Sequence, residues 1–237
     1  MHIGIKGKTV NPGAVPPRNL VFLLDVSGSM DSPDKLPLLK HGHTRLVRTL
    51  RAADRVSIVV YAGAAGVVLP PTSGGETQTI TAALQRLEAG GSTAGGAGIE
   101  LAYKLAEESF IKGGINRVLL ASDGDFNVGV SSVGELTKLI EKKRESGVFL
   151  TTLGFGTGNY RDDMMERLAD KGNGNYAYID STREAERALV EQANATLVTI
   201  AKDLKLQVEF NPSRVQGYRL IGYQNNTRET GLKRLNS

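Results

Sequence analysis

The chain has 237 residues, with no cysteine, no tryptophan and only three histidines. Without cysteine it can form no disulfide, no thiolate metal site and no cysteine nucleophile. Aromatic residues make up 5% of the chain, whereas a nucleic-acid-binding surface normally combines a basic stripe with stacking aromatic side chains. The remaining composition, 40% hydrophobic and 23% charged, is that of an ordinary folded protein.

Long apolar segments are also missing. The longest apolar stretch, residues 56–69, is interrupted by Ser57 and by glycines, and it is shorter than the roughly 20 residues that cross a bilayer. No apolar run of the signal-peptide type follows Met1. We therefore expect no membrane-spanning segment. A cytoplasmic location is expected, or the cell envelope or extracellular space if a targeting segment has been removed.

The excess positive charge lies at one end of the chain. Residues 202–237 contain seven basic and three acidic side chains, which equals the net charge of +4 for the whole protein. The preceding 201 residues are therefore neutral overall, despite a pI of about 9.2. This distribution leaves no basic stripe on the main part of the chain, and we expect no nucleic-acid partner.

Buried strands alternate with amphipathic helices over residues 18–201. The expected strands are residues 20–26, 56–61, 66–69, 117–122, 148–154 and 175–180, and the expected helices start near Pro33, Glu76, Gly98, Val133, Asp162 and Glu184. Such alternation is typical of a mainly parallel sheet covered by helices on both faces. The sequence predicts a doubly wound, Rossmann-like α/β domain with six strands.

The two ends of the chain follow a different pattern. A short strand, residues 2–8, precedes a proline-containing linker that ends at residue 17. Residues 204–210 and 218–223 are rich in β-forming residues and no longer alternate with helices. We interpret residues 1–17 as an N-terminal β segment with its linker, and residues 202–237 as the start of an incomplete, β-rich second module.

Oxygen-bearing side chains gather in three loops of the predicted domain. The first follows residues 20–26, the second precedes the glycine-rich helix start and the third follows residues 117–122; they carry Asp25, Ser27 and Ser29, then Ser92 and Thr93, then Asp123. Doubly wound folds bind ligands beyond the carboxyl ends of the strands, where the strand order reverses. With the order 3-2-1-4-5-6 along the sheet, Asp25 and Asp123 would face one cavity.

Two carboxylates and several hydroxyls, with no histidine or cysteine nearby, form an all-oxygen set. Such ligands suit Mg²⁺, Mn²⁺ or Ca²⁺ rather than zinc or copper. Protein groups and water need not fill all of about six coordination positions, so a partner's carboxylate could complete the shell. Gly28 permits the tight bend between Ser27 and Ser29.

These residues resemble a known site, the metal-ion-dependent adhesion site of von Willebrand factor A domains. The likeness is carried by the run Asp25-Val26-Ser27-Gly28-Ser29-Met30, by Thr93 within Gly-Gly-Ser-Thr-Ala-Gly-Gly, and by Asp123-Gly124 after a hydrophobic strand. All five ligand positions match. Residues 59–71, 87–102 and 123–131 further resemble a bacterial group in which the A domain is flanked by β segments and a further C-terminal domain.

The resemblance implies roles that the residues alone do not assign. Ser27, Ser29 and Thr93 would contact the metal directly, with Thr93 changing between direct and water-mediated contact when a ligand binds. Asp25 and Asp123 would act mainly through water. The last helix, residues 184–200, moves on ligand binding in some relatives.

Several residues have competing interpretations. Gly28, Ser92 and Asp125 are candidates for supporting positions beside the ligands, although Asp125 next to glycine is more often a turn residue. The segment 90–98 resembles a phosphate cradle but lacks the Gly-Lys-Ser/Thr ending of a P-loop. His41 and His43 point to different faces of a helix, so we expect a solvated and a partly buried packing residue rather than a metal site.

The sequence predicts a non-enzymatic protein in which Mg²⁺ coordinates an acidic group of a protein or other macromolecule. One alternative, which the resemblance implies, is an adaptor or scaffold for an ATPase complex, because some A-domain proteins have that role. A less favoured alternative is an Mg²⁺-dependent phosphohydrolase with Asp25 as nucleophile, similar to the haloacid dehalogenase family. That chemistry usually needs a second aspartate two residues later, where this chain has Ser27.

Overall fold

A computed structural model describes residues 15–91, 95–124, 133–157 and 162–191, together with Asn211, Ser213 and Arg214. The chain divides into two units, Met1–Ile200 and Ala201–Ser237. The predicted strands 2–8, 204–210 and 218–223 lie outside the described residues. The predicted domain limits at residues 18 and 201, and the incomplete second module, therefore stay predictions.

The first unit contains a six-stranded sheet, as predicted. Its strands are β1 (Arg18–Asp25), β2 (Arg55–Tyr61), β3 (Ala65–Ser73), β4 (Ile115–Ser122), β5 (Val148–Phe155) and β6 (Tyr176–Ile179). They lie in the order β3-β2-β1-β4-β5-β6, which is the order that brings the predicted loops together. All neighbours are parallel except β2 and β3. All residues of the central strands β1 and β4 are buried, which explains their continuous apolar runs.

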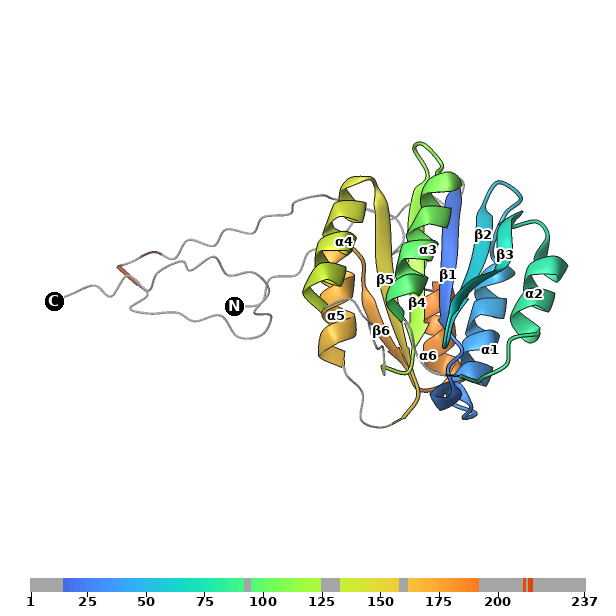
Figure 1. The fold of residues 1–237 in the computed structure, drawn as a ribbon. Coiled ribbons are helices and arrows are strands. Elements are labelled where there is room, and N and C mark those ends of the chain that lie inside the picture. The colour runs from blue at the N-terminus through green and yellow to red at the C-terminus, as the bar shows by residue number, and fades with distance from the viewer. Residues whose placement is uncertain are drawn as a thin grey trace. The chain divides into compact units, whose positions relative to one another are not determined.

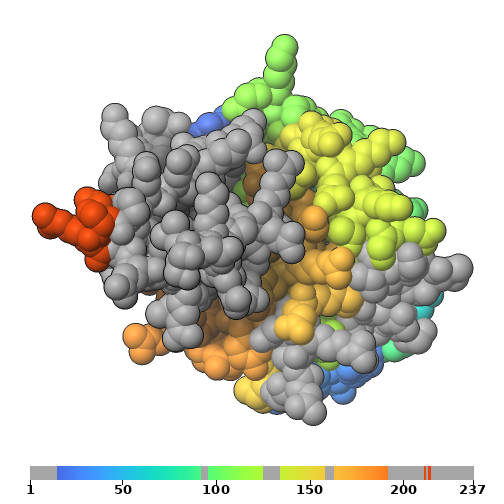
Figure 2. Space-filling view, turned by 90° about the vertical axis from the view of Figure 1, so that its left-hand side faces the viewer, coloured from blue at the N-terminus to red at the C-terminus, as the bar shows by residue number. Residues whose placement is uncertain are grey.

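Helices cover both faces of this sheet (Figure 1). One apolar cluster joins the sheet to α1 (Leu36–Val47), α2 (Thr77–Gln85) and α6 (Thr182–Glu186). A second cluster on the opposite face joins it to α3 (Gly95–Glu108), α4 (Val133–Glu145) and α5 (Asp162–Lys171). Helices α4 and α5 lie at the surface in the view of Figure 2. The three-layer arrangement therefore confirms the predicted doubly wound fold.

Some element ends differ from the prediction. Strand β3 extends through Pro70 and Pro71, which a strand at the sheet edge tolerates because its outer N–H groups need no partner. The helical spacing of apolar residues predicts that Phe110 continues the buried stripe of α3, but the helix ends at Glu108 and Phe110 is 41% exposed. Helix α6 continues into a π-helical turn, Arg187–Glu191, and the rest of the predicted last helix lies outside the described residues.

His43 is more deeply buried than expected, whereas His41 is exposed as predicted. The His43 ring packs edge-on against Phe22, and its Nδ1 lies 2.9 Å from the Leu39 carbonyl oxygen one turn earlier in α1. Burial lowers the pKa of His43 to about 4. His43 is therefore a neutral residue of the core, and the two histidines form no metal site.

Candidate metal centre

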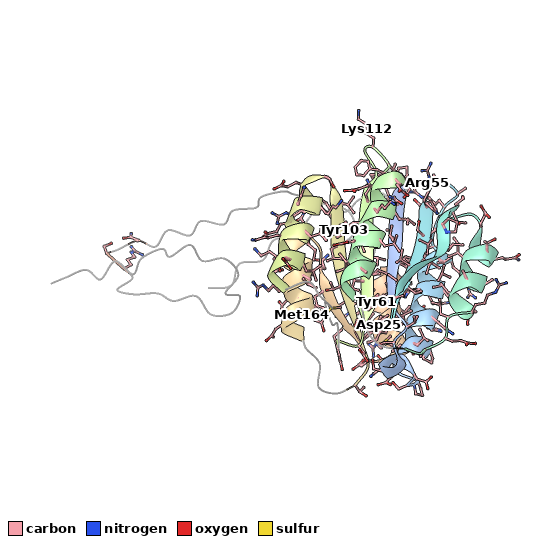
Figure 3. All side chains as sticks on the ribbon, viewed as in Figure 1. Asp25, Arg55, Tyr61, Tyr103, Lys112 and Met164 are labelled. Carbon is pink, nitrogen blue, oxygen red and sulfur yellow. The ribbon has the colours of Figure 1, made fainter. Side chains whose placement is uncertain are left out.

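Asp25, the last residue of β1, lies at the centre of the candidate site. Figure 3 shows it beside Tyr61, at the end of the sheet opposite Arg55 and Lys112. Strand pairing sets Asp25 next to Tyr61, the last residue of β2. The Tyr61 hydroxyl donates to Asp25 Oδ2 at 3.2 Å, and the hydroxyl of Ser122, the last residue of β4, donates to the same oxygen at 2.9 Å. Three adjacent strand ends therefore fix this carboxylate.

The Asp25 carboxylate is fully buried, and its hydrogen-bond donors among the residues that the structure describes are all uncharged. Its Oδ1 accepts from the backbone N–H of Ser27 at 2.9 Å. Burial raises the pKa of Asp25, and the negative charge of Asp123 raises it further. The hydrogen bonds from Ser27 and Ser122 lower the pKa, but burial has the larger effect. Burial and the Asp25 charge also raise the pKa of Tyr61 well above its ordinary value. A cation at this edge would stabilise the ionised Asp25.

The loop after β1 presents two hydroxyls. Ser27 has extended backbone angles and precedes a short 3-10 turn, Gly28–Met30. The Oγ atoms of Ser27 and Ser29 are 3.1 Å apart. Mg²⁺ binds oxygens at about 2.0 to 2.1 Å in octahedral geometry, which sets adjacent ligand atoms about 3 Å apart. The spacing of the two hydroxyls therefore fits neighbouring positions of such a shell.

The glycine-rich loop lies against this turn. The Gly28 N–H donates to the Gly91 carbonyl at 3.1 Å, and the Gly90 N–H donates to the Val26 carbonyl at 2.8 Å. Gly91 has a φ of +79°, in the left-handed region that favours glycine. Further along, Gly98 packs so closely on the sheet that a Cβ there would lie 3.1 Å from atoms of Leu23 and Tyr61. These glycines bring the second predicted loop close to the first.

Asp123 directly follows β4 and is nearly buried. Its Oδ2 accepts a hydrogen bond from the Lys35 ammonium at 2.9 Å, and the same ammonium donates to the Ser29 carbonyl at 2.9 Å. Lys35 therefore connects the loop after β1 with the loop after β4. A positive group already lies among the oxygen atoms of this edge, which agrees with the chemistry of a cation site.

The structure brings together four of the five predicted ligands, Asp25, Ser27, Ser29 and Asp123, together with Gly28. Thr93, Ser92 and Asp125 lie outside the described residues, so their roles stay predictions. Among the described residues there is no group of three or more histidine, aspartate or glutamate side chains that could hold a metal. The described residues therefore offer the hydroxyls of Ser27 and Ser29 beside the two carboxylates, and the predicted ligand set stays a prediction.

Three side chains at this edge, those of Tyr61, Ser122 and Lys35, were not among the residues predicted from the sequence. Ser122 immediately precedes Asp123, and Tyr61 ends β2 as Asp25 ends β1, so a search of strand ends would have found both. Lys35 had no comparable signal, because its contact with Asp123 spans 88 residues.

Comparison with known proteins agrees with this geometry. The family model for the von Willebrand factor type A domain matches residues 19–214. The chain belongs to the von Willebrand factor type A family. The domains of this family are generally interaction modules, and they often bind a divalent metal ion.

The uncharacterized protein YfbK of Escherichia coli (strain K12) is 50% identical to this von Willebrand factor type A chain over 224 residues. The match covers 94% of this chain and 39% of YfbK, so the chain spans less than half the length of that relative.

Two solved structures share the fold of this von Willebrand factor type A domain. The conserved hypothetical protein BatB from Bacteroides thetaiotaomicron is 20% identical with a TM-score of 0.64, covering 75% of this chain and 98% of BatB. The manganese-loaded TRAP protein of Plasmodium vivax is 20% identical with a TM-score of 0.60, covering 74% of this chain and 72% of TRAP. Among the described residues of this chain, no helix is both long and apolar enough to cross a membrane.

Proposed function

We propose that this von Willebrand factor type A domain holds Mg²⁺ at its sheet edge and uses the ion to bind an acidic group of a partner protein. The observation that carries the proposal is the Asp25 carboxylate, which is fully buried, has a raised pKa and, within the described part of the chain, accepts hydrogen bonds from uncharged groups alone. A buried charge without a cation is costly, and a bound divalent ion removes that cost.

The residues that would hold the ion are Asp25, Ser27, Ser29, Thr93 and Asp123. The 3.1 Å spacing of the serine hydroxyls supports a hard, octahedral cation such as Mg²⁺. Mn²⁺ has similar ligand preferences, and the manganese-loaded TRAP structure makes it a sensible second metal to test. The bound ion would supply positive charge and an open coordination position.

The arrangement of Asp25 supports binding rather than catalysis. A nucleophilic aspartate must reach the atom that it attacks, but Asp25 is 0% exposed and both its oxygens accept hydrogen bonds from the protein. The residue two positions later, Ser27, offers a hydroxyl in place of a carboxylic acid and cannot act as the expected proton donor.

The partner is expected to offer a carboxylate. Mg²⁺ prefers about six oxygen ligands, and the ligand set of this chain leaves room for a group from outside. A carboxylate is a hard oxygen ligand with a negative charge, so it suits an open coordination position on such an ion.

Metal binding is tested by titration calorimetry of the chelator-treated protein with Mg²⁺ and Mn²⁺. We expect binding by the wild type and at least tenfold weaker binding by Asp25→Ala and Asp123→Ala, on the order of the effects seen at metal sites. Asp31→Asn is a matched control, because Asp31 is an exposed acid next to the same turn. Unchanged metal affinity in both alanine variants would refute the site.

Partner binding is tested by capture from a native lysate, with Mg²⁺ or with chelator, on wild type and Asp25→Ala. The expected result is a protein retained only by the wild type with Mg²⁺ and released by an acidic peptide. Retention that is equal in chelator would contradict a metal-mediated contact. Recovery of an ATPase would favour the adaptor alternative instead.

A further inference from the structure

We propose that Lys35 is a tethered cation that neutralises Asp123 in the metal-free protein and competes with the divalent ion for the same oxygens. Lys35 thereby acts as a positioning residue that sets the metal affinity of the site. This inference rests on the metal-binding function proposed above.

The contacts of Lys35 are those of a bound cation. Its Nζ lies 2.9 Å from Asp123 Oδ2 and 2.9 Å from the Ser29 carbonyl oxygen. The Lys35 side chain is 24% exposed and the Asp123 side chain 3%, so this ion pair is largely shielded from water. Pairs of this kind interact more strongly than ion pairs on an open surface.

The neighbouring loop holds Lys35 in place. The Asp34 carboxylate accepts hydrogen bonds from the backbone N–H and the hydroxyl of Thr157, both at 2.8 Å, which ties the start of α1 to the loop after β5. The preceding residue, Gly156, has a φ of +111°, and a Cβ there would lie 3.0 Å from Lys35 Cε. The Lys35 stem therefore runs along a glycine surface that directs its ammonium towards Asp123.

The charges explain what this arrangement does. Without metal, the negative charges of Asp25 and Asp123 repel each other, and the Lys35 ammonium, 2.9 Å from Asp123 Oδ2, offsets part of that repulsion. A divalent ion that approaches Asp123 meets the Lys35 charge and must displace it or bind beside it. Lys35 therefore stabilises the metal-free site and weakens metal binding. A partner's carboxylate would counter this repulsion, so metal and partner would favour each other's binding.

The first test compares Mg²⁺ affinity by calorimetry in the wild type, Lys35→Met and Lys35→Arg. Loss of the charge should tighten Mg²⁺ binding about tenfold, since a single charge a few ångströms away has an effect of that order. Lys35→Arg should keep the affinity near the wild-type value. Lys40→Met is the control: Lys40 is on the same helix, but its ammonium donates to the Gln85 carbonyl at 3.1 Å. Unchanged or weaker Mg²⁺ binding by Lys35→Met would overturn the proposal.

The second test needs no metal. In chelator, urea unfolding of wild type, Lys35→Met, Asp123→Asn and the double variant forms a double-mutant cycle. We expect a favourable coupling between the two side chains, and no coupling would overturn the neutralising role. Mg²⁺ binding by Lys35→Met but not by the wild type would support competition directly. No Mg²⁺ binding by either protein would refute the proposed function and the competition together, while the cycle would still decide whether Lys35 and Asp123 interact.

Discussion

Two fully buried aspartates lie at opposite ends of the sheet, and their surroundings differ in charge. Asp54, just before β2, accepts hydrogen bonds from the Arg51 side chain and from the backbone N–H groups of Arg18 and Arg51. Asp25, at the end of β1, accepts among the described residues from a backbone N–H and from hydroxyls, and from no basic side chain. The two aspartates are equally inaccessible to water. Within the described residues, Asp54 has an arginine partner, whereas Asp25 has no basic hydrogen-bond partner.

The pKa values of the two aspartates differ in the same way. Burial alone would raise the pKa of Asp54, but hydrogen bonds from Arg51 and the charge of Arg18 bring it below its ordinary value. At Asp25 burial prevails, and its pKa is raised. A buried carboxylate with a structural role has its cation within the protein. One that lacks a cation is suited to bind a cation from outside.

Asp123 is intermediate between these two cases. Its carboxylate pairs with Lys35 through one ammonium contact, whereas the Arg51 guanidinium contacts Asp54 through two of its nitrogen atoms. A single ammonium contact is easier to displace than the multiple contacts of Arg51 with Asp54. The carboxyl end of the sheet therefore has one aspartate without a cation and one with a replaceable cation.

The largest expected effect is a difference in stability between variants of the two aspartates, measured in the presence of chelator. Asp54→Asn should lower the free energy of unfolding by about 2 kcal/mol, because Arg51 loses its charged partner and buried donors lose an acceptor. Asp25→Asn should leave it unchanged or raise it, because the substitution removes an unpaired charge and the hydroxyls of Tyr61 and Ser122 can accept from an amide. Urea unfolding measures both, and equal losses would remove the distinction.

A smaller effect is expected in the pH dependence of stability. The pKa of Asp54 is lowered on folding, so its contribution is fully present above the ordinary value of 3.8 and is lost as the pH falls through the lowered value. The pKa of Asp25 is raised, so the metal-free protein loses stability as the pH rises from 3.8 through the raised value. The two contributions therefore have opposite signs.

Unfolding free energies of wild type, Asp54→Asn and Asp25→Asn in chelator, measured over this pH range, test the signs. The difference between wild type and Asp54→Asn should increase with pH, and the difference between wild type and Asp25→Asn should decrease. Saturating Mg²⁺ should abolish the second trend but not the first, because the ion stabilises the ionised Asp25. If both differences changed with pH in the same direction, the surroundings of the two carboxylates would be alike.

The fold could be predicted from the sequence because local patterns of apolar residues indicate the strands and helices. Continuous apolar runs indicate the buried strands β1 and β4, and helical spacing indicates the faces that cover them. The gathering of Asp25, Ser27, Ser29 and Asp123 was also predictable, since they follow or end strands whose carboxyl ends the parallel topology brings to one edge.

The groups around the predicted ligands were predictable only in part. Tyr61 and Ser122 end the strands on either side of β1, so the same rule could have found them, but only the structure shows that both contact the Asp25 carboxylate. Lys35 follows no spacing rule, because its contact with Asp123 depends on how two loops fold over Gly156. Helix ends were missed for a related reason: Phe110 continues the apolar period of α3, but the chain leaves the helix before reaching it.

The smallest expected effect compares two buried serines at the opposite ends of the sheet. Ser122 donates to Asp25 Oδ2 at 2.9 Å, and the Ser109 hydroxyl lies 2.7 Å from the Leu105 carbonyl oxygen and 3.0 Å from the Asn19 side-chain oxygen. Each alanine substitution should lower the free energy of unfolding by about 1 kcal/mol, the usual value for one buried hydrogen bond. Only Ser122→Ala should also weaken Mg²⁺ binding, by about tenfold, as losses next to metal ligands do. Because the two variants lose the same chemical group at similar burial, a matching loss of Mg²⁺ affinity in Ser109→Ala would mean that the effect comes from the stability of the domain and not from the position of Asp25.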